Sequence, residues 1–210
     1  MREFLEKFKQ YGFINFIKRM FLSALRRIGL SYSKWLIIEK EINIETLPNF
    51  SINEKFYIKE MTYIDYSNTT HLSESKLKRI KQKIDSKYFY SYGVFDNNNN
   101  IAYYCWISLK EFQFSNDAYY TPLKFDEGLL FGAFCFPKYR GNKLHNYMNI
   151  YRLKMLLKFK KNNAIGAILY ENTPARKSQK NAGFECNKIV KTFNFFGYKW
   201  HQTINKKISL

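Results

Sequence analysis

The sequence has few acidic residues for its many basic ones. Its 17 Asp and Glu residues stand against 35 Lys and Arg residues, so the formal net charge is +18. Such an excess attracts polyanions, among them nucleic acid, anionic lipid and phosphate-rich cofactors. The excess also fits a general bias toward Lys, Asn, Ile, Tyr and Phe, so charge alone selects no partner.

Cysteine and long apolar runs are also scarce. Cys105, Cys135 and Cys186 are far apart and form no CxxC or Cys/His spacing, so we expect no metal site. A sparse, odd set of thiols is typical of a cytoplasmic protein. Charged residues interrupt the first ten positions, which disfavours a signal peptide. The longest apolar run lies within 128–137. That is far short of the roughly 20 residues that a membrane-spanning helix needs.

Residues 1–30 are predicted to form a basic amphipathic helix beside the main domain. Apolar residues recur there with helical spacing. They are Phe13, Phe16, Ile17, Met20, Phe21, Ala24, Leu25 and Ile28. The first interpretation is that this stripe packs on the main domain or on another protomer, which would give a homodimer. The alternative is peripheral contact with an anionic membrane surface, at the inner face of the membrane.

Residues 31–210 are predicted to form a single domain of the α/β (α+β) class, because strand-like and helical patterns alternate. Strands are expected at 34–38, 55–61, 88–95, 101–109, 128–136, 164–170 and within 184–204. Helices are expected at 73–85, from the turn at 138–142 to about 161, and from Pro174 to Gly183. Asn residues tolerate left-handed backbone, so 96–100 is predicted to be a hairpin turn. The near-continuous apolar run at 128–136 indicates a strand buried on both faces.

A strand, a basic turn and a helix start follow one another at 134–145. The first turn of a helix has unpaired N–H groups and a partial positive charge, so it can bind an anion such as pyrophosphate. Gly141 would permit close approach of the backbone, and Lys138, Arg140 and Lys143 would add positive charge. By itself this arrangement is common in α/β proteins that bind no ligand.

A second segment makes the first more informative. A predicted strand ends at Tyr170-Glu171-Asn172 and leads into a short helix that Gly183 closes. Together the two segments resemble the GNAT superfamily of N-acetyltransferases, closely over 128–184. In that family one strand ends in V-x-P-x-x-R-G-x-G-x-G/A, and the next leads to N-x-x-A or N-x-x-S and a later G-F pair. The matching residues are Pro137, Arg140, Gly141, Asn172, Ala175, Gly183 and Phe184.

The resemblance implies a GNAT-like, mixed and mostly antiparallel sheet flanked by helices. A V-shaped split between two parallel strands would take the pantetheine arm of the co-substrate acetyl-CoA. Turn amides would hold the pyrophosphate, and a main-chain N–H near Cys135 would stabilise the oxyanion. The implied cofactor-binding residues are Cys135, Phe136, Arg140, Gly141, Asn142, Lys143, Leu144, His145 and Asn172.

Three positions depart from the family pattern. Lys143 and His145 stand where the second and third glycines usually lie, although Lys143 still offers its N–H group. His145 either contacts phosphate or is a structural histidine with satisfied hydrogen bonds, and the second is the simpler interpretation. Gln179 replaces a tyrosine that protonates the departing thiolate in many relatives. A thiolate whose conjugate acid has a pKa of about 8–9 can leave without that help.

A general base must take a proton from the attacking amine. Glu171 is the first candidate for this catalytic role, because it should open into the cleft beside Asn172. Asp126 and Glu127 precede the central strand and are alternatives. For each of the three, a solvated or salt-bridged carboxylate is the competing interpretation. Tyr103, Tyr104 and Trp106 alternate along a neighbouring strand, so one face should be core and the other could line an acceptor pocket.

The sequence therefore predicts a cytoplasmic, acetyl-CoA-dependent N-acetyltransferase that acylates a primary amine by direct transfer. A resemblance to acetyltransferases of surface-polysaccharide and amino-sugar pathways favours a small-molecule acceptor, an amino sugar or nucleotide-linked sugar. No specific nucleic acid is expected as a partner of this enzyme. The alternative is a non-catalytic GNAT-like module that binds nucleic acid or an anionic membrane surface.

Overall fold

The computed structural model describes residues 17, 20–21, 24–25, 27–49, 51–69, 72–114 and 119–210. These divide into two compact units. Unit 1 consists of the described parts of Met1–Lys40, Phe112–Thr121 and Ile165–Leu210, and unit 2 of those of Glu41–Glu111 and Pro122–Ala164. That residues 31–210 form one domain stays a prediction.

The predicted N-terminal helix falls mostly outside the described residues. The described positions within it that are helical are Ile17, Met20, Phe21, Ala24, Leu25 and Arg27. In the part of the chain that the structure describes, no helix is both long enough and apolar enough to span a bilayer.

Unit 2 contains an antiparallel sheet with the strand order β7-β4-β3-β2. Its strands are β2 (Phe56–Glu60), β3 (Phe89–Asp96), β4 (Ile101–Ser108) and β7 (Glu127–Cys135). The predicted hairpin turn joins β3 to β4. There Oδ1 of Asp96 accepts hydrogen bonds from the N–H groups of Asn98 and Asn100, and Asn99 has φ of 62°. The Asn-rich tract thus forms this turn because Asn tolerates left-handed backbone.

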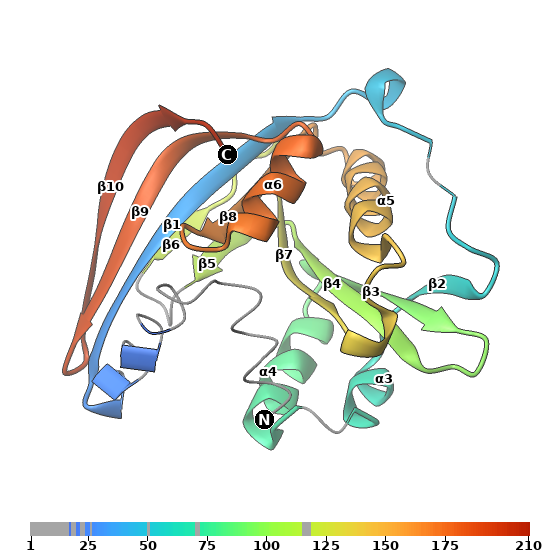
Figure 1. Cartoon of the computed structure of the whole chain (residues 1–210), viewed down its shortest axis with the longest axis horizontal. Helices are drawn as coiled ribbons and strands as arrows, with labels where there is room; N and C mark the ends of the chain where they lie inside the picture. Colours follow the sequence, from blue (N-terminus) through green and yellow to red (C-terminus); the bar gives the residue numbers. More distant parts are fainter. Residues whose placement is uncertain are drawn as a thin grey trace. The chain divides into compact units, whose positions relative to one another are not determined.

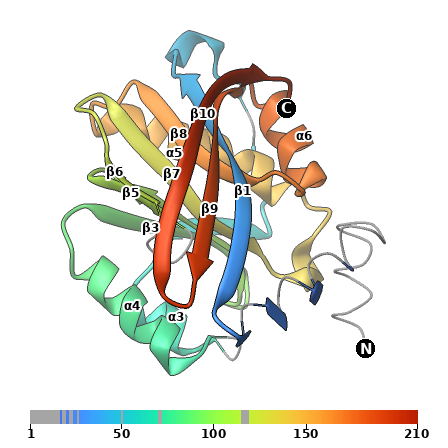
Figure 2. The same ribbon diagram turned by 90° about the vertical axis from the view of Figure 1, so that its left-hand side faces the viewer.

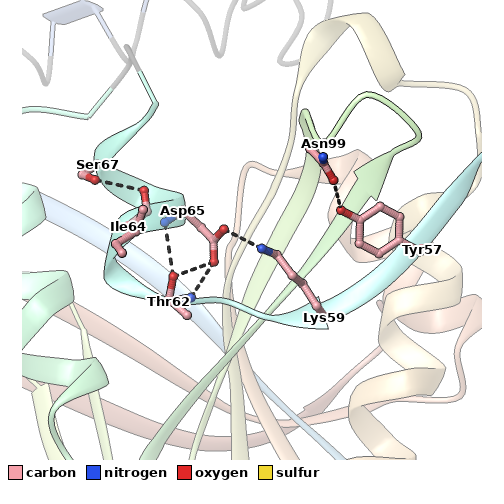
Figure 3. Close-up of polar contacts among 7 residues, drawn as sticks. All are labelled: Tyr57, Lys59, Thr62, Ile64, Asp65, Ser67 and Asn99. Atoms are coloured by element: carbon pink, nitrogen blue, oxygen red, sulfur yellow. Dashed lines mark hydrogen bonds and ion pairs between the residues drawn. The ribbon is translucent and has the colours of Figure 1, made fainter.

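The helical segments of unit 2 are η1 (Ile44–Thr46), α3 (Tyr63–Ser67), α4 (Glu74–Ile84), η2 (Pro137–Tyr139) and α5 (Leu144–Lys158) (Figure 1). The sequence analysis predicted α4 and α5 but missed α3. A capping box begins α3: the Thr62 hydroxyl accepts from the N–H of Asp65, and the Asp65 carboxylate accepts from the N–H of Thr62 (Figure 3). The ammonium of Lys59, on β2, lies 2.7 Å from Oδ1 of Asp65 and links this helix to the sheet (Figure 3).

Side chains of β4 alternate between two covered faces. On one face the Trp106 ring stacks on that of Tyr66 from α3, with centroids 5.6 Å apart. On the other face Tyr103 contacts His145 of α5. Tyr103 and Trp106 are 1% and 5% exposed, so both are core residues of unit 2. The acceptor-pocket interpretation therefore does not apply to these two side chains.

Unit 1 contains strands in the order β10-β9-β1-β8 together with helix α6 (Thr173–Asn181). The strands are β1 (Leu30–Glu41), β8 (Asn163–Leu169), β9 (Glu185–Phe195) and β10 (Tyr198–Ile208); β5 (Glu111–Phe114) pairs separately with β6 (Tyr119–Pro122). Antiparallel pairing with β9 extends β1 well beyond the predicted 34–38, from Leu30 to Glu39. Figure 2 shows β10, β9 and β1 as long strands side by side.

The predicted fold class is confirmed: the chain is a mixed α/β structure with a mostly antiparallel sheet that is flanked by helices. The V-shaped split implied by the family resemblance would involve strands of both units, and it stays a prediction.

Candidate functional site

The central strand β7 carries a bulge at Gly132. In the pairing with β4, Gly132 and Ala133 together lie opposite the single residue Cys105. Gly132 has φ of +61°, and a Cβ there would lie 2.8 Å from Cδ1 of Trp106. Gly132 and Ala133 are both exposed. The expectation of a strand buried on both faces was therefore wrong for this part of β7, because the bulge interrupts the regular alternation.

The turn between β7 and α5 has an open backbone. Gly141 has φ of +89°, and, apart from the glycine itself and its two chain neighbours, no described residue has an atom within 4 Å of the position that a Cβ would occupy. Lys143, the residue before α5, has φ of 57°, and no side chain caps the helix start. That left-handed conformation favours glycine, the residue that the family pattern has at this position. The first turn of α5 thus offers N–H groups that no side-chain cap covers.

Cys135 and Phe136, predicted to pair with pantetheine, lie where β7 meets η2. The N–H of Phe136 donates to the carbonyl of Ala102 on β4, at 3.0 Å. That donor is thus engaged within unit 2, whereas Gly132 and Ala133 on the same strand are exposed residues. The sequence analysis did not select these two residues. A glycine inside an apolar strand run is the signal that could have indicated the bulge.

An aspartate anchors the turn. Oδ2 of Asp96, in the β3–β4 hairpin, accepts a hydrogen bond from the Tyr139 hydroxyl at 2.6 Å. That bond is the main reason why the pKa of Asp96 is lowered to about 2. Burial and the neighbouring Asp96 raise the pKa of Tyr139 to about 12. Two residues beyond Tyr139 comes Gly141, and the side-chain amide of Asn142 donates to the Tyr139 carbonyl at 2.8 Å.

His145 is held by hydrogen bonds at both ring nitrogens. Its Nδ1 lies 2.8 Å from the Tyr103 hydroxyl and its Nε2 lies 3.3 Å from Nδ2 of Asn149. Oδ1 of Asn149 accepts from Arg152, so the Asn149 amide must present its N–H to Nε2. Nε2 is therefore the acceptor, and Nδ1 carries the proton toward Tyr103. Burial, with a contribution from Arg152, lowers the pKa of His145 to about 4, so the ring is neutral near pH 7.

This network indicates a structural role for the His145 side chain, while its main-chain N–H remains in the first turn of α5. That His145 contacts the cofactor stays a prediction, and it now concerns the main-chain N–H of His145 and not its ring. Arg152, at the other end of the network, is 2% exposed. Within the described residues its Nε has no hydrogen-bond partner, although Asn149 accepts from Nη2. The guanidinium is thus a buried positive charge on α5.

The second motif is built into α6, in unit 1. Oδ1 of Asn172 accepts from the N–H of Ala175 at 3.3 Å, so the two motif positions are joined as a helix N-cap. At the other end Gly183 has φ of +79°, and the N–H of Phe184 donates to the carbonyl of Gln179 at 3.0 Å. This is a Schellman-type ending. The spacing of the N-x-x-A and G-F residues therefore has a local structural cause.

The candidate bases differ in their surroundings. Oδ2 of Asp126 accepts from the side-chain amide of Asn163 at 2.6 Å. Oε2 of Glu127 accepts from the N–H of Lys124 at 2.8 Å, and Oε1 lies 3.3 Å from the Lys124 ammonium. These contacts favour structural roles for both carboxylates. Glu171 is partly buried and lies directly before the N-cap of α6.

Gln179 and the thiols limit the chemistry available. Oε1 of Gln179 is buried and accepts no hydrogen bond from the described part of the chain. Burial raises the pKa of Cys105 to about 11 and also raises the pKa of Cys135 and Cys186. The thiols are therefore protonated near neutral pH and poorly suited to act as nucleophiles. Across the residues that can be described, no group of three or more His, Cys, Asp or Glu could hold a metal ion.

An aromatic cluster beside the bulge holds a lysine that the sequence analysis also missed. The Lys83 ammonium, on α4, lies 4.6 Å from the ring centroid of Phe131, 5.4 Å from that of Phe89 and 5.9 Å from that of Trp106. Burial lowers the pKa of Lys83. This face of the sheet, beside Gly132, thus accommodates an alkylammonium against aromatic rings. No local pattern could reveal it, because the rings come from three strands.

Structural comparison gives the fold its name. A tandem GNAT protein from the clavulanic acid biosynthesis pathway matches with a TM-score of 0.56 and 12% identity, over 86% of this chain. A GCN5-related N-acetyltransferase from Sphaerobacter thermophilus matches with a TM-score of 0.54 and 9% identity, over 91% of this chain. The chain has the GNAT fold. A putative GNAT acetyltransferase from Novosphingobium aromaticivorans also matches, with a TM-score of 0.54 and 14% identity over 78% of this chain.

Sequence comparison adds nothing to this likeness. No protein-family model matches the chain, and no curated protein matches it in sequence. The chain spans 57%, 58% and 63% of the lengths of the clavulanic-acid-pathway, Sphaerobacter and Novosphingobium chains. The comparison therefore shows the GNAT fold. It does not assign the substrates of those proteins to this chain.

Proposed function

We propose that this protein is an acetyl-CoA-dependent N-acetyltransferase. The observation that carries the proposal is the turn from β7 into α5. Gly141 has φ of +89° with open space around it, the helix start lacks a side-chain cap, and Lys138, Arg140 and Lys143 surround it. The N-terminus of a 15-residue helix, open and basic, suits the pyrophosphate of coenzyme A. The GNAT fold supports the same assignment.

In the proposed reaction the amine attacks the thioester carbonyl directly. The N–C bond forms, the C–S bond breaks, and coenzyme A leaves as a thiolate. Protonated thiols at Cys105, Cys135 and Cys186 support direct transfer over a cysteinyl intermediate. Glu171 is the proposed base, beside Asn172 at the end of β8, and Glu171→Gln should lower kcat while sparing acetyl-CoA binding. Gln179 cannot protonate the thiolate, so solvent would do so.

The acceptor in this proposal is a primary amine on a sugar or nucleotide-linked sugar. Its support is the resemblance of short motifs, stated in the sequence analysis, to acetyltransferases of amino-sugar and surface-polysaccharide pathways. A cytoplasmic location belongs to the same proposal and rests on the sparse, unpaired cysteines. A panel of amino sugars, a polyamine and a lysine peptide, assayed for release of coenzyme A, tests the acceptor class. Turnover of only the polyamine or the peptide would reject the proposed sugar acceptor, but it would support the proposed acetyltransferase activity.

The decisive test of function is stabilisation by acetyl-CoA. A ligand at about 100 times its Kd should add about 2.7 kcal/mol to the free energy of unfolding. Arg140→Glu should remove this stabilisation. Lys154→Glu makes the same charge change at an exposed position of α5 and should retain it. A folded protein that millimolar acetyl-CoA does not stabilise would instead be a non-catalytic module with this fold.

A further inference from the structure

The β9–β10 hairpin of unit 1 ends in an exposed aromatic turn. Phe195 pairs with Tyr198, and Phe196 and Gly197 form the two-residue loop between them. Phe195, Phe196, Tyr198 and Trp200 are 52%, 63%, 78% and 49% exposed. Large apolar side chains that gather on one exposed surface, rather than singly, mark an interaction site.

Turn chemistry does not explain the phenylalanine at this tip. Phe196 and Gly197 have φ of 48° and 97°, so both central residues of the loop are left-handed. Such two-residue hairpin loops favour Asn-Gly, because Asn tolerates the conformation far better than a bulky residue does. Asn194 already supports the loop, since its Oδ1 accepts from the N–H of Gly197 at 3.0 Å. The Phe196 ring therefore opposes the backbone preference and is not buried in return.

The tip is continuous with the end of the N-terminal helix. The N–H of Phe196 donates to the carbonyl of Gly29 at 2.8 Å, and a Cβ on Gly29 would lie 3.1 Å from Cδ1 of Phe196. Ile28, next to Gly29, is 57% exposed. We call Ile28, Phe195, Phe196, Tyr198 and Trp200 the tip surface. Figure 2 shows the hairpin loop beside the start of β1.

The charge around the tip surface has one sign. Residues 27–38 and 186–210, which contain it, include no Asp or Glu. The basic residues on the loop side of these strands are Arg27, Lys34, Lys191 and Lys199; Lys188, Lys206 and Lys207 lie at the far end of the hairpin, where Lys207 pairs with Glu185. Lys199 is exposed between Tyr198 and Trp200. A second copy of the chain would bring the same positive charges together, so this surface suits an anionic partner better than itself.

We propose that the tip surface docks the protein on an anionic lipid membrane. Tyr198 and Trp200, whose rings have one apolar and one polar end, favour the boundary between headgroups and acyl chains, whereas Phe195, Phe196 and Ile28 favour its apolar side. The surrounding lysines and Arg27 attract anionic headgroups. Exposed apolar side chains together with basic ones are the two features that hold a protein in this interface. The inference does not depend on acetyl transfer.

Flotation of the full chain with lipid vesicles tests the proposal. The chain should float with vesicles of phosphatidylcholine and phosphatidylglycerol, and not with phosphatidylcholine alone. Salt should weaken the binding. The variant Phe196→Ser with Tyr198→Ser should lower the partition coefficient about tenfold or more, because it removes apolar contact with the bilayer. Phe125→Ser is the matched control: Phe125 is 86% exposed in unit 2, and its loss should change nothing.

Two charge-reversal variants and a fluorescence measurement give further tests, so that the result does not rely on a single substitution. Lys199→Glu should weaken vesicle binding several-fold, whereas Lys78→Glu, on the exposed side of α4, should not. Trp200 emission should shift to the blue with anionic vesicles, and Trp200→Phe should lose that shift. Circular dichroism and melting temperature establish that each variant is folded.

Three results would overturn the inference. The first is a folded wild-type chain that stays unbound to anionic vesicles. The second is a tip variant that floats as well as wild type. The third is a lipid-free dimer that the tip variant converts to a monomer, which would make the tip surface a contact between copies.

Discussion

The Tyr139 hydroxyl and Asp96 Oδ2 lie 2.6 Å apart, in a hydrogen bond that ties the β3–β4 hairpin turn to the segment preceding Arg140. Asp96, 43 positions before Tyr139 in the sequence, thus helps to fix the path of the backbone toward Gly141. Because Asp96 also accepts from Asn98 and Asn100, it holds its own loop and the candidate phosphate turn together.

We expect Tyr139→Phe to weaken acetyl-CoA binding several-fold while leaving the fold intact, because the turn loses the hydrogen bond between the Tyr139 hydroxyl and Asp96. Asp96→Asn should act in the same direction. Isothermal titration with acetyl-CoA measures the effect. Asp85→Asn, an exposed acid at the end of α4, is the matched control and should bind like wild type. Equal affinity in all four proteins would show that the Asp96–Tyr139 bond does not position the turn.

The same carboxylate should leave a signature at acid pH. Its folded pKa of about 2 lies below the ordinary value of about 3.9, so folding favours the ionised form. The stabilisation is fully present above about pH 4 and is lost as the pH falls toward 2. The difference in melting temperature between wild type and Asp96→Asn should therefore shrink across that window. A constant difference would contradict the assigned pKa.

Gly141→Ala should separate ligand binding from folding. A non-glycine residue in the left-handed region costs about 1–2 kcal/mol, and the open space around Gly141 adds no clash within the protein. A bound pyrophosphate would, however, meet the new methyl group. Gly197→Ala provides the control, because Gly197 has φ of +97° with the same open surroundings. Both variants should lose similar stability in urea denaturation, and only Gly141→Ala should lose acetyl-CoA affinity.

Asn172→Ala should lower the free energy of unfolding by about 1 kcal/mol, because it removes the N-cap bond to Ala175. Ser73→Ala is the comparison, since Ser73 precedes α4 without a side-chain cap bond. Chemical denaturation of both variants measures the difference. If Asn172 also lies near pantetheine, its replacement will weaken acetyl-CoA binding by more than the stability loss explains; Ser73→Ala will not.

The buried His145 network should make stability depend on pH. The folded pKa of about 4 is below the ordinary 6.5, so the unfolded chain binds the proton more tightly. Stability should therefore fall as the pH drops from about 6.5 to 4, by at most about 3 kcal/mol. His145→Gln should remove that slope, and exposed His201→Gln should keep it. Urea denaturation at several pH values measures both slopes, and identical slopes in the two variants would contradict the buried network.

Elements with a strong local pattern were predictable from sequence. The helix α5 follows from its apolar period, and the turn at 96–100 from its Asn residues. The start of α6 follows from Asn172, whose side chain caps the helix, and its end follows from Gly183, which adopts the left-handed backbone conformation. Both effects involve only neighbouring residues. The candidate phosphate turn could be proposed for the same reason, because the order of a strand, Arg140-Gly141 and a helix start is local.

Features that depend on distant partners were not predictable. The bulge at Gly132 arises in pairing with β4, and β1 is long because β9 runs beside it. The partners of His145 show the same limit, because Tyr103, whose hydroxyl lies within hydrogen-bond distance of the ring, is 42 positions away in the sequence. Pattern reasoning also placed Gly132 and Ala133 in the core, since apolar composition does not reveal where a strand bends.

The strand β10 ends the strand order of unit 1, and along its 11 residues most side chains are exposed. Such an edge offers unpaired backbone groups on which a strand of another molecule could add, a route to aggregation. Lys199, Lys206 and Lys207 lie along it, and its register shifts between Asn205 and Ile208. Charged side chains and an irregular register both discourage strand addition. The basic composition of this segment therefore also protects the molecule against self-association through β10.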